Sequence, residues 1–65
     1  MNYKERMTIQ LMRNRTVGLS PKTQADIAQE FHLSKMYVNE VINEKRQGPK
    51  AIEWRTKFAK YAGIK

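Results

Sequence analysis

The chain has 65 residues, with 13 Lys and Arg against 6 Asp and Glu, no Cys and a single His. Such a short chain forms one domain with a marginal core and little room for an enzyme's pocket, and it lacks the residues for disulfides, a cysteine zinc site or a multi-histidine metal site. No apolar run approaches the roughly 18 residues that cross a bilayer, and no signal peptide is visible. We therefore expect a cytoplasmic protein that does not bind a membrane. We also expect that it is not an enzyme and binds no cofactor, metal or small-molecule substrate.

Apolar residues recur three or four positions apart along almost the whole chain, and no stretch alternates with period two. This pattern predicts an all-α fold. The first helix is expected from about Lys4 to about Asn14, with Met7 and Leu11 on one stripe. A loop should follow over residues 15–22, where a glycine and a proline interrupt helical structure.

The second helix is predicted over residues 23–31, and two start signals compete for it. Ser20 followed by Pro21 is typical of an N-cap with proline at the first helical position. Thr23 with Asp26 three residues later is a variant of the capping box. The sequence leaves both open.

The third and fourth helices have clear start and stop signals. Ser34 is a good N-cap, because its hydroxyl accepts a free backbone N–H of the first turn, and it predicts a helix over residues 35–44. Pro49 suits the first turn of a fourth helix over residues 49–62, and Gly63 follows where a left-handed C-cap is needed.

Residues 23–44 have the organisation of a helix-turn-helix, with two short helices joined by a turn of about three residues. The small side chain of Ala28 stands where the second helix of the pair must approach closely. The second helix of such a motif projects an outer face that can enter the DNA major groove. The expected core comprises Ile27, Ala28, Val38, Val41 and Phe58.

Positive charge is concentrated at the two ends of the chain. Residues 1–20 have a net charge of +3, residues 21–44 of −2, and residues 45–65 of +6. A solvated basic surface would explain this distribution, and so would a polyanionic partner, because lysine and arginine placed on phosphates release condensed counterions. An anionic membrane is disfavoured, since no strongly apolar face stands opposite a basic one.

The chain resembles the phage repressor and Cro-like (XRE-type) helix-turn-helix family over most of its length. The resemblance is carried by Thr23-Gln24, Ile27-Ala28, Leu33-Ser34, Val38, Val41, Asn43, Lys45, Pro49-Lys50 and the run Phe58–Ile64. It implies a small, lambda-repressor-like domain of four helices, or a five-helix-like variant of it, over residues 1–65. It also implies a sequence-specific DNA-binding transcriptional regulator from a bacterial or phage setting.

The sequence departs from the family pattern in four places. His32 stands where glycine is usual in the turn, and His tolerates the left-handed conformation better than most residues. Glu44 replaces a glycine that often ends the recognition helix, so we expect that helix to run on to this residue. The loop 17–22 is longer than usual, and we expect the fold to lack the later helix that supplies dimer contacts in the family.

Base contacts are expected from the outer face of the third helix. Lys35 can donate to guanine, Asn39 can pair with adenine, and Met36 can touch a thymine methyl group. The alternative is that these are ordinary solvated helix residues. The full set of expected base-contacting residues is Ser34, Lys35, Met36, Asn39 and Glu40.

Phosphate contacts are expected on both sides of that helix. Gln24 matches a family position whose amide bonds a phosphate and braces the recognition helix, and free N–H groups at a helix start favour anions. The expected phosphate-contacting residues are Thr23, Gln24, Tyr37, Asn43, Lys45, Arg46 and Lys50.

We expect the protein to bind double-stranded DNA at a palindromic operator as a weak homodimer that the DNA reinforces. Trp54, Tyr61 and Ile64 are the expected interface residues, since helices 23–31 and 35–44 can cover only one face of the last helix. Two other hypotheses stay open. One is a protein-interaction module of antirepressor or antitoxin type, and the other is a phage excision factor that bends DNA.

Overall fold

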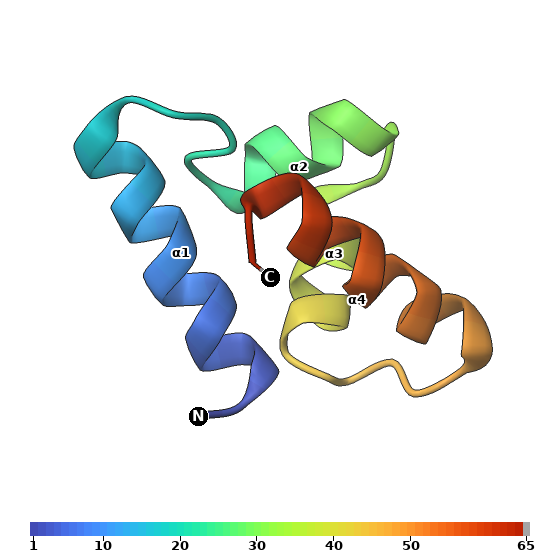
Figure 1. The fold of residues 1–65 in the computed structure, drawn as a ribbon. Coiled ribbons are helices and arrows are strands. Elements are labelled where there is room, and N and C mark those ends of the chain that lie inside the picture. The colour runs from blue at the N-terminus through green and yellow to red at the C-terminus, as the bar shows by residue number, and fades with distance from the viewer. Residues whose placement is uncertain (65) are drawn as a thin grey trace.

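Residues 1–64, which the computed structural model describes, form four helices and no strand (Figure 1). The helices are α1 (Tyr3–Val17), α2 (Gln24–Phe31), α3 (Lys35–Ile42) and α4 (Pro49–Ala62). In Figure 1, α1 stands to one side, α2 and α3 follow one another across a short turn, and α4 packs against both α1 and α3. The expected all-α class with four helices is confirmed.

The first helix is longer than the sequence pattern predicts, because it continues past Asn14 to Val17. The prediction that residues 15–17 belong to the loop is therefore wrong. Asn14 does not interrupt the helix, since its buried side chain is directed inward: Nδ2 donates to the carbonyl oxygens of Pro21 (2.9 Å) and Ala62 (3.1 Å). The helix ends instead at Gly18, which adopts the left-handed conformation with φ 77°.

The second helix begins at the later of its two candidate signals. Thr23 is the N-cap, and its Oγ1 accepts the backbone N–H of Asp26 at 3.4 Å. The Asp26 carboxylate accepts the backbone N–H of Lys22 at 2.7 Å, which completes a capping-box variant. Pro21 lies outside the helix, buried in the preceding loop.

A non-glycine residue in the left-handed conformation follows each of the helices α2 and α3: His32, with φ 57°, directly after α2, and Glu44, with φ 61°, two residues after the last residue of α3. In each case the next backbone N–H bonds back into the helix: Leu33 to Ala28 at 2.8 Å and Lys45 to Glu40 at 2.9 Å. This is the Schellman arrangement, which usually uses glycine. The expectation that α3 runs on to Glu44 is therefore wrong, because Glu44 takes the role of that glycine and the helix ends at Ile42.

The core is built mainly from the inward faces of all four helices. All five residues expected there are buried, at 0 to 4% exposure. The complete buried hydrophobic cluster is Met7, Leu11, Ile27, Ala28, Val38, Val41, Ile42, Ala51, Phe58 and Ala62.

Aromatic side chains extend this core between the end of α2 and α4. The ring of Phe31 lies 5.4 Å from that of Trp54, 5.6 Å from Phe58 and 5.6 Å from Tyr61, measured between centroids. Edge-to-face and tilted pairs of this kind add stabilisation beyond the apolar area they bury. Trp54 is thus a packing residue of the fold.

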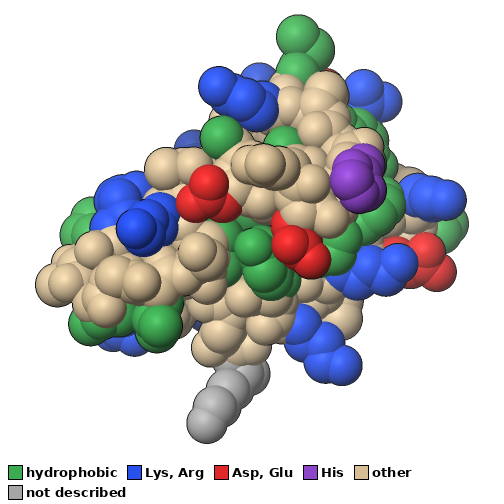
Figure 2. Space-filling model, turned by 90° about the horizontal axis from the view of Figure 1, so that it is seen from above, with side chains coloured by type: hydrophobic (Ala, Val, Ile, Leu, Met, Phe, Trp, Pro, Cys, Tyr) green, Lys and Arg blue, Asp and Glu red, His purple; other side chains and the backbone are tan. Residues whose placement is uncertain are grey.

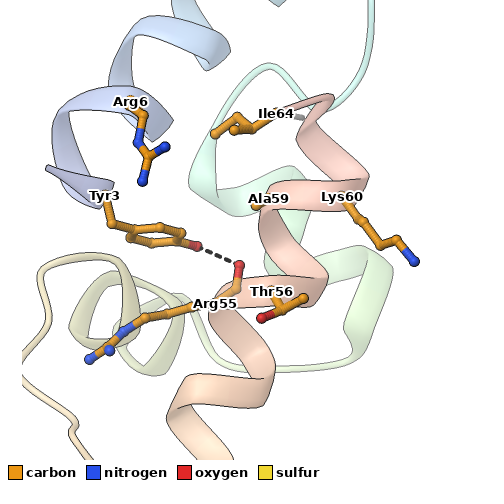
Figure 3. A pocket seen from close by; sticks show the side chains of 7 residues that line it. All are labelled: Tyr3, Arg6, Arg55, Thr56, Ala59, Lys60 and Ile64. Carbon is orange, nitrogen blue, oxygen red and sulfur yellow. Dashed lines mark hydrogen bonds between the residues drawn. The ribbon is translucent and has the colours of Figure 1, made fainter. Parts of the chain in front are cut away.

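One hydrogen bond connects the start of α1 to the middle of α4. The Tyr3 hydroxyl donates to the carbonyl oxygen of Arg55 at 3.0 Å (Figure 3). Burial raises the pKa of the Tyr3 phenol to about 12, the positive charge of Arg55 opposes this rise, and the negative charge of Glu44 adds to it. Tyr3 therefore remains a protonated donor at neutral pH.

We expect Ala28→Leu to destabilise the protein by about 1–3 kcal/mol, because the larger side chain overpacks the contact between α2 and α3. Ala25→Leu, at an exposed position of the same helix, is the matched control and should change stability by less than about 0.5 kcal/mol. Urea denaturation of both variants measures the difference. Equal effects would contradict the close approach of the two helices at Ala28.

Tyr3→Phe should lower stability at neutral pH by about 0.5–1.5 kcal/mol, because the bond to Arg55 is lost. The unfolded chain releases the phenolic proton near the ordinary pKa of 10.0, whereas the folded chain holds it up to about 12. The stability of the wild-type protein relative to Tyr3→Phe should therefore fall as the pH rises from 10 toward 12. Denaturation curves over that range test this, and parallel pH profiles would contradict it.

Candidate nucleic-acid interface

Helices α2 and α3 form a helix-turn-helix across a turn at residues 32–34. One face of α3 is buried through Val38, Val41 and Ile42, at no more than 1% exposure. The opposite face carries Lys35 and Met36 into solvent, and Met36 is 74% exposed. The second helix of the motif thus has a free outer surface.

The expected base-contacting residues lie together at and after the start of α3. Ser34 is the N-cap and its Oγ accepts the backbone N–H of Tyr37 at 3.1 Å, so the hydroxyl hydrogen remains available to a ligand. Asn39 is exposed one turn along the helix. Glu40 differs from the others, since its side chain is only 27% exposed and faces an arginine.

A side-chain hydrogen bond braces the motif. Nδ2 of Asn39 donates to Oε1 of Gln24 at 3.1 Å, which ties the outer face of α3 to the first residue of α2. The side-chain oxygen of Gln24, which would repel a phosphate, accepts this hydrogen bond. The NH₂ group of Gln24 therefore remains available as a donor. Asn39 keeps its own oxygen and its second N–H for other partners.

Glu40 and Arg46 form an ion pair that the sequence analysis did not foresee. Arg46 Nη2 lies 3.3 Å from Glu40 Oε1, and the guanidinium also lies over the Tyr37 ring, 5.6 Å from its centroid. An expected base-contacting residue and two expected phosphate-contacting residues therefore interact with one another. The pair masks the Glu40 charge, which would otherwise repel a phosphate.

The remaining expected phosphate-contacting residues flank α3. Thr23 and Gln24 lie at the start of α2, and Asn43 caps the end of α3 in a half-buried position. Lys45 and Lys50 are exposed in the α3–α4 loop and the first turn of α4. Within residues 1–64, neither of these lysines forms an ion pair.

Arg55 positions the α3–α4 loop and was missed from sequence. Its Nη2 donates to the carbonyl oxygen of Arg46 at 2.6 Å and approaches Oε1 of Gln47 at 3.4 Å. Its Nε is buried without a hydrogen-bond partner. A side chain that bonds a loop carbonyl leaves no periodic signal in the sequence, because the contact depends on where the loop passes α4.

The residues expected at a dimer interface do not share one face. Trp54 and Tyr61 are half-buried against Phe31 on the α2 side of α4. Ile64 instead lines a hollow with Tyr3. The reason is the left-handed Gly63, after which the Ile64 N–H bonds back to the Ala59 carbonyl at 2.9 Å and turns the chain.

Two acidic side chains, Asp26 and Glu30, line a polar hollow of about 500 Å³ that no residue of α3 lines. Figure 2, a view from above, shows Asp and Glu side chains near the middle of the face, the histidine close to them, and Lys and Arg mostly around the rim. Within residues 1–64, no three His, Cys, Asp or Glu side chains are placed to hold a metal ion. The acidic hollow is lined by Ser20, Asp26, Gln29, Glu30, His32 and Tyr61.

Comparison with known proteins finds no matching family model, and no curated protein or solved structure shows a significant match to the chain. No helix in residues 1–64 is long and apolar enough to cross a lipid bilayer. The functional argument therefore depends on the geometry of the helix-turn-helix and on the residues that surround it.

Proposed function

We propose that the chain is a sequence-specific DNA-binding regulator of the phage repressor and Cro type, which acts in the cytoplasm of a bacterial or phage-infected cell. The observation that carries this proposal is the Asn39–Gln24 hydrogen bond at 3.1 Å, which braces the exposed face of α3 against α2. A braced outer face presents fixed donors and acceptors, and recognition of base edges in the major groove requires these. The proposed function is binding alone, with no catalytic step.

The proposed binding mode gives each side chain a distinct role. α3 enters the major groove, where Lys35 donates to guanine and Asn39 pairs with adenine through its oxygen and its second N–H. Met36, the most exposed apolar residue of the helix, contacts a thymine methyl group. Gln24 donates its free NH₂ group to a phosphate beside the groove.

Basic residues outside the groove supply affinity without sequence preference. Lys45 and Lys50 are exposed and form no ion pair in the described part of the chain, so their full charge is available to the phosphate backbone. Arg46 is held by Glu40 in the unbound protein and contributes less unless DNA draws it away. The bound protein regulates by occupying an operator and excluding polymerase.

Selection of bound duplexes from a random library tests the proposal directly. A defined consensus, with affinity that falls steeply as salt rises, is the expected result. No enrichment and no salt dependence would overturn DNA binding and favour a protein-interaction module. Strong bending of the selected duplex, measured by gel mobility or energy transfer, would favour an architectural excision factor over a simple repressor.

Asn39→Ala and Lys45→Ala should separate base recognition from phosphate contact. Asn39→Ala should reduce the difference in binding free energy between the preferred base pair and the others, at one position of the operator, by about 1–3 kcal/mol. Lys45→Ala should weaken binding to every duplex alike. It should also reduce the steepness of the plot of log affinity against log salt concentration by about one. Titrations of operator and random duplex measure both, with the exposed Lys4→Ala in α1 as a control that should change little. If both variants lost operator and random binding equally, these roles would be wrong.

A palindromic operator should bind two protomers, with half-sites about one helical turn apart. The free protein should be mainly monomeric at low micromolar concentration, because a few half-buried residues cannot supply the roughly 1,200 Å² of a stable interface. Analytical ultracentrifugation with and without the duplex measures both states. A strict one-to-one complex on a palindrome would contradict the dimeric binding mode.

A further inference from the structure

A groove runs between α1 and the C-terminal half of α4, on residues that the helix-turn-helix does not use. It consists of two adjoining hollows of about 290 and 340 Å³, which share Arg6 and Ile64 in their lining. Figure 3 shows the first hollow, with Arg6 and Tyr3 on one side and Ile64, Ala59 and Lys60 on the other. No residue of α2 or α3 lines either hollow.

The groove has apolar walls within a basic rim. Tyr3, Ala59 and Ile64 contribute apolar surface to the first hollow, and Ile9 contributes it to the second. Each of these four side chains is only partly buried, so the apolar surface remains accessible. The fold has thus left a concave apolar strip uncovered at its surface.

Arginine and lysine side chains supply the charged part of the lining. Arg6 and Arg13 come from α1 and Lys60 from α4, and all three are exposed. Arg55 lines the far end of the first hollow. Neither hollow is lined by an Asp or Glu, so nothing in the described lining neutralises this charge.

We infer that this groove binds an acidic segment of a partner protein that carries two apolar side chains. Two adjoining hollows provide space for two apolar side chains, and the rim arginines and lysine pair with carboxylates beside them. The pairing also raises the association rate, because the whole chain carries a net charge of +7.

The charge and the apolar walls of the groove exclude two other candidate occupants, a second copy of this chain and a nucleic acid. A second copy placed symmetrically would set the same basic rim against itself, and like charges across an interface oppose association. Nucleic acid would satisfy the cations, but a phosphate backbone has no group to fill the apolar strip formed by Tyr3, Ala59 and Ile64. A protein segment with carboxylates and apolar side chains satisfies both parts of the groove.

The backbone around the groove holds its walls in place. Ile64 is fixed by the hydrogen bond from its N–H to the Ala59 carbonyl, and the Tyr3 hydroxyl is fixed on the Arg55 carbonyl at 3.0 Å. The site therefore exists before a ligand arrives, and little ordering opposes binding.

Selection of peptides from a random dodecapeptide library against the full chain tests the inference. The expected result is enrichment of peptides with two apolar residues flanked by Asp or Glu. Enrichment of neutral or basic peptides, or no enrichment, would overturn it. The best peptide is then synthesised with a fluorescent label, and its affinity is measured by anisotropy.

The double variant Arg6→Glu with Lys60→Glu should reduce the affinity for the labelled peptide by at least about tenfold, because carboxylates then face carboxylates. The matched control is Lys4→Glu with Lys57→Glu, which makes the same charge change on the same two helices outside the groove. Circular dichroism verifies that both variants fold. An equal loss of peptide affinity in the control variant would show that only net charge matters, and it would overturn the proposal that the groove binds the peptide.

Ile9→Ser keeps every charge and removes part of the apolar wall of the second hollow, so it should weaken peptide binding by several-fold while leaving affinity for duplex DNA unchanged. If Arg6→Glu with Lys60→Glu instead weakened DNA binding and left the peptide unaffected, the groove would be a phosphate contact. Because none of these residues belongs to α2 or α3, this inference and the proposed DNA binding can each fail without the other.

Discussion

The close packing of α2 against α3 is the contact on which the rest of the structure depends. Ala28, whose side chain is only a methyl group, is buried in the core that the two helices share, and His32 takes a left-handed conformation that turns the chain between them. A left-handed non-glycine residue costs roughly 1–2 kcal/mol. Burial of Ile27 and Val38 offsets this cost, since each fully buried aliphatic side chain contributes about 1.5–3 kcal/mol. The packing orients α3 so that one face closes the core and the other remains in solvent.

Acidic and basic side chains lie on different parts of the surface, which the net charge of the chain does not show. Asp26 and Glu30 line the acidic hollow beside α2, and Glu40 is paired with Arg46. The acidic charge of the central segment is thus partly removed from the outer face of α3. Lys45 and Lys50 beside it remain exposed and, in the described part of the chain, without an ion pair. A surface of this kind suits the polyanion that we propose, whereas the uncovered groove between α1 and α4 combines its cations with apolar walls.

A series of contacts links the start of the chain to the loop that follows α3. Tyr3 donates to the backbone of Arg55, and the Arg55 guanidinium in turn donates to the backbone of Arg46. Arg46 then contacts both Glu40 and Tyr37 of α3. Hydrogen bonds and ion pairs of this type limit the conformations open to a loop. The loop that carries Lys45 is consequently supported from the far side of the molecule.

Helix periodicity and cap residues in the sequence were sufficient to predict the four helices, the helix-turn-helix and the five central core residues. These features depend on residues close together in the chain, where spacing alone determines which side chains share a face. Gln24 was also expected to brace the third helix, and the structure contains its hydrogen bond to Asn39. The ends of α1 and α3 were misjudged, because Asn14 was not expected to turn inward and Glu44 was not expected to take a glycine conformation.

Only the tertiary structure decided the contacts between segments that are far apart in sequence. The Glu40–Arg46 pair, the support of the loop by Arg55, and the separation of Ile64 from Trp54 and Tyr61 all depend on how the chain turns between helices. The groove beside Arg6 and Lys60 likewise exists only once α1 has packed on α4. The physical reason is that a sequence pattern specifies which face of a helix is apolar, whereas the angle at which two helices meet specifies which polar side chains come within bonding distance.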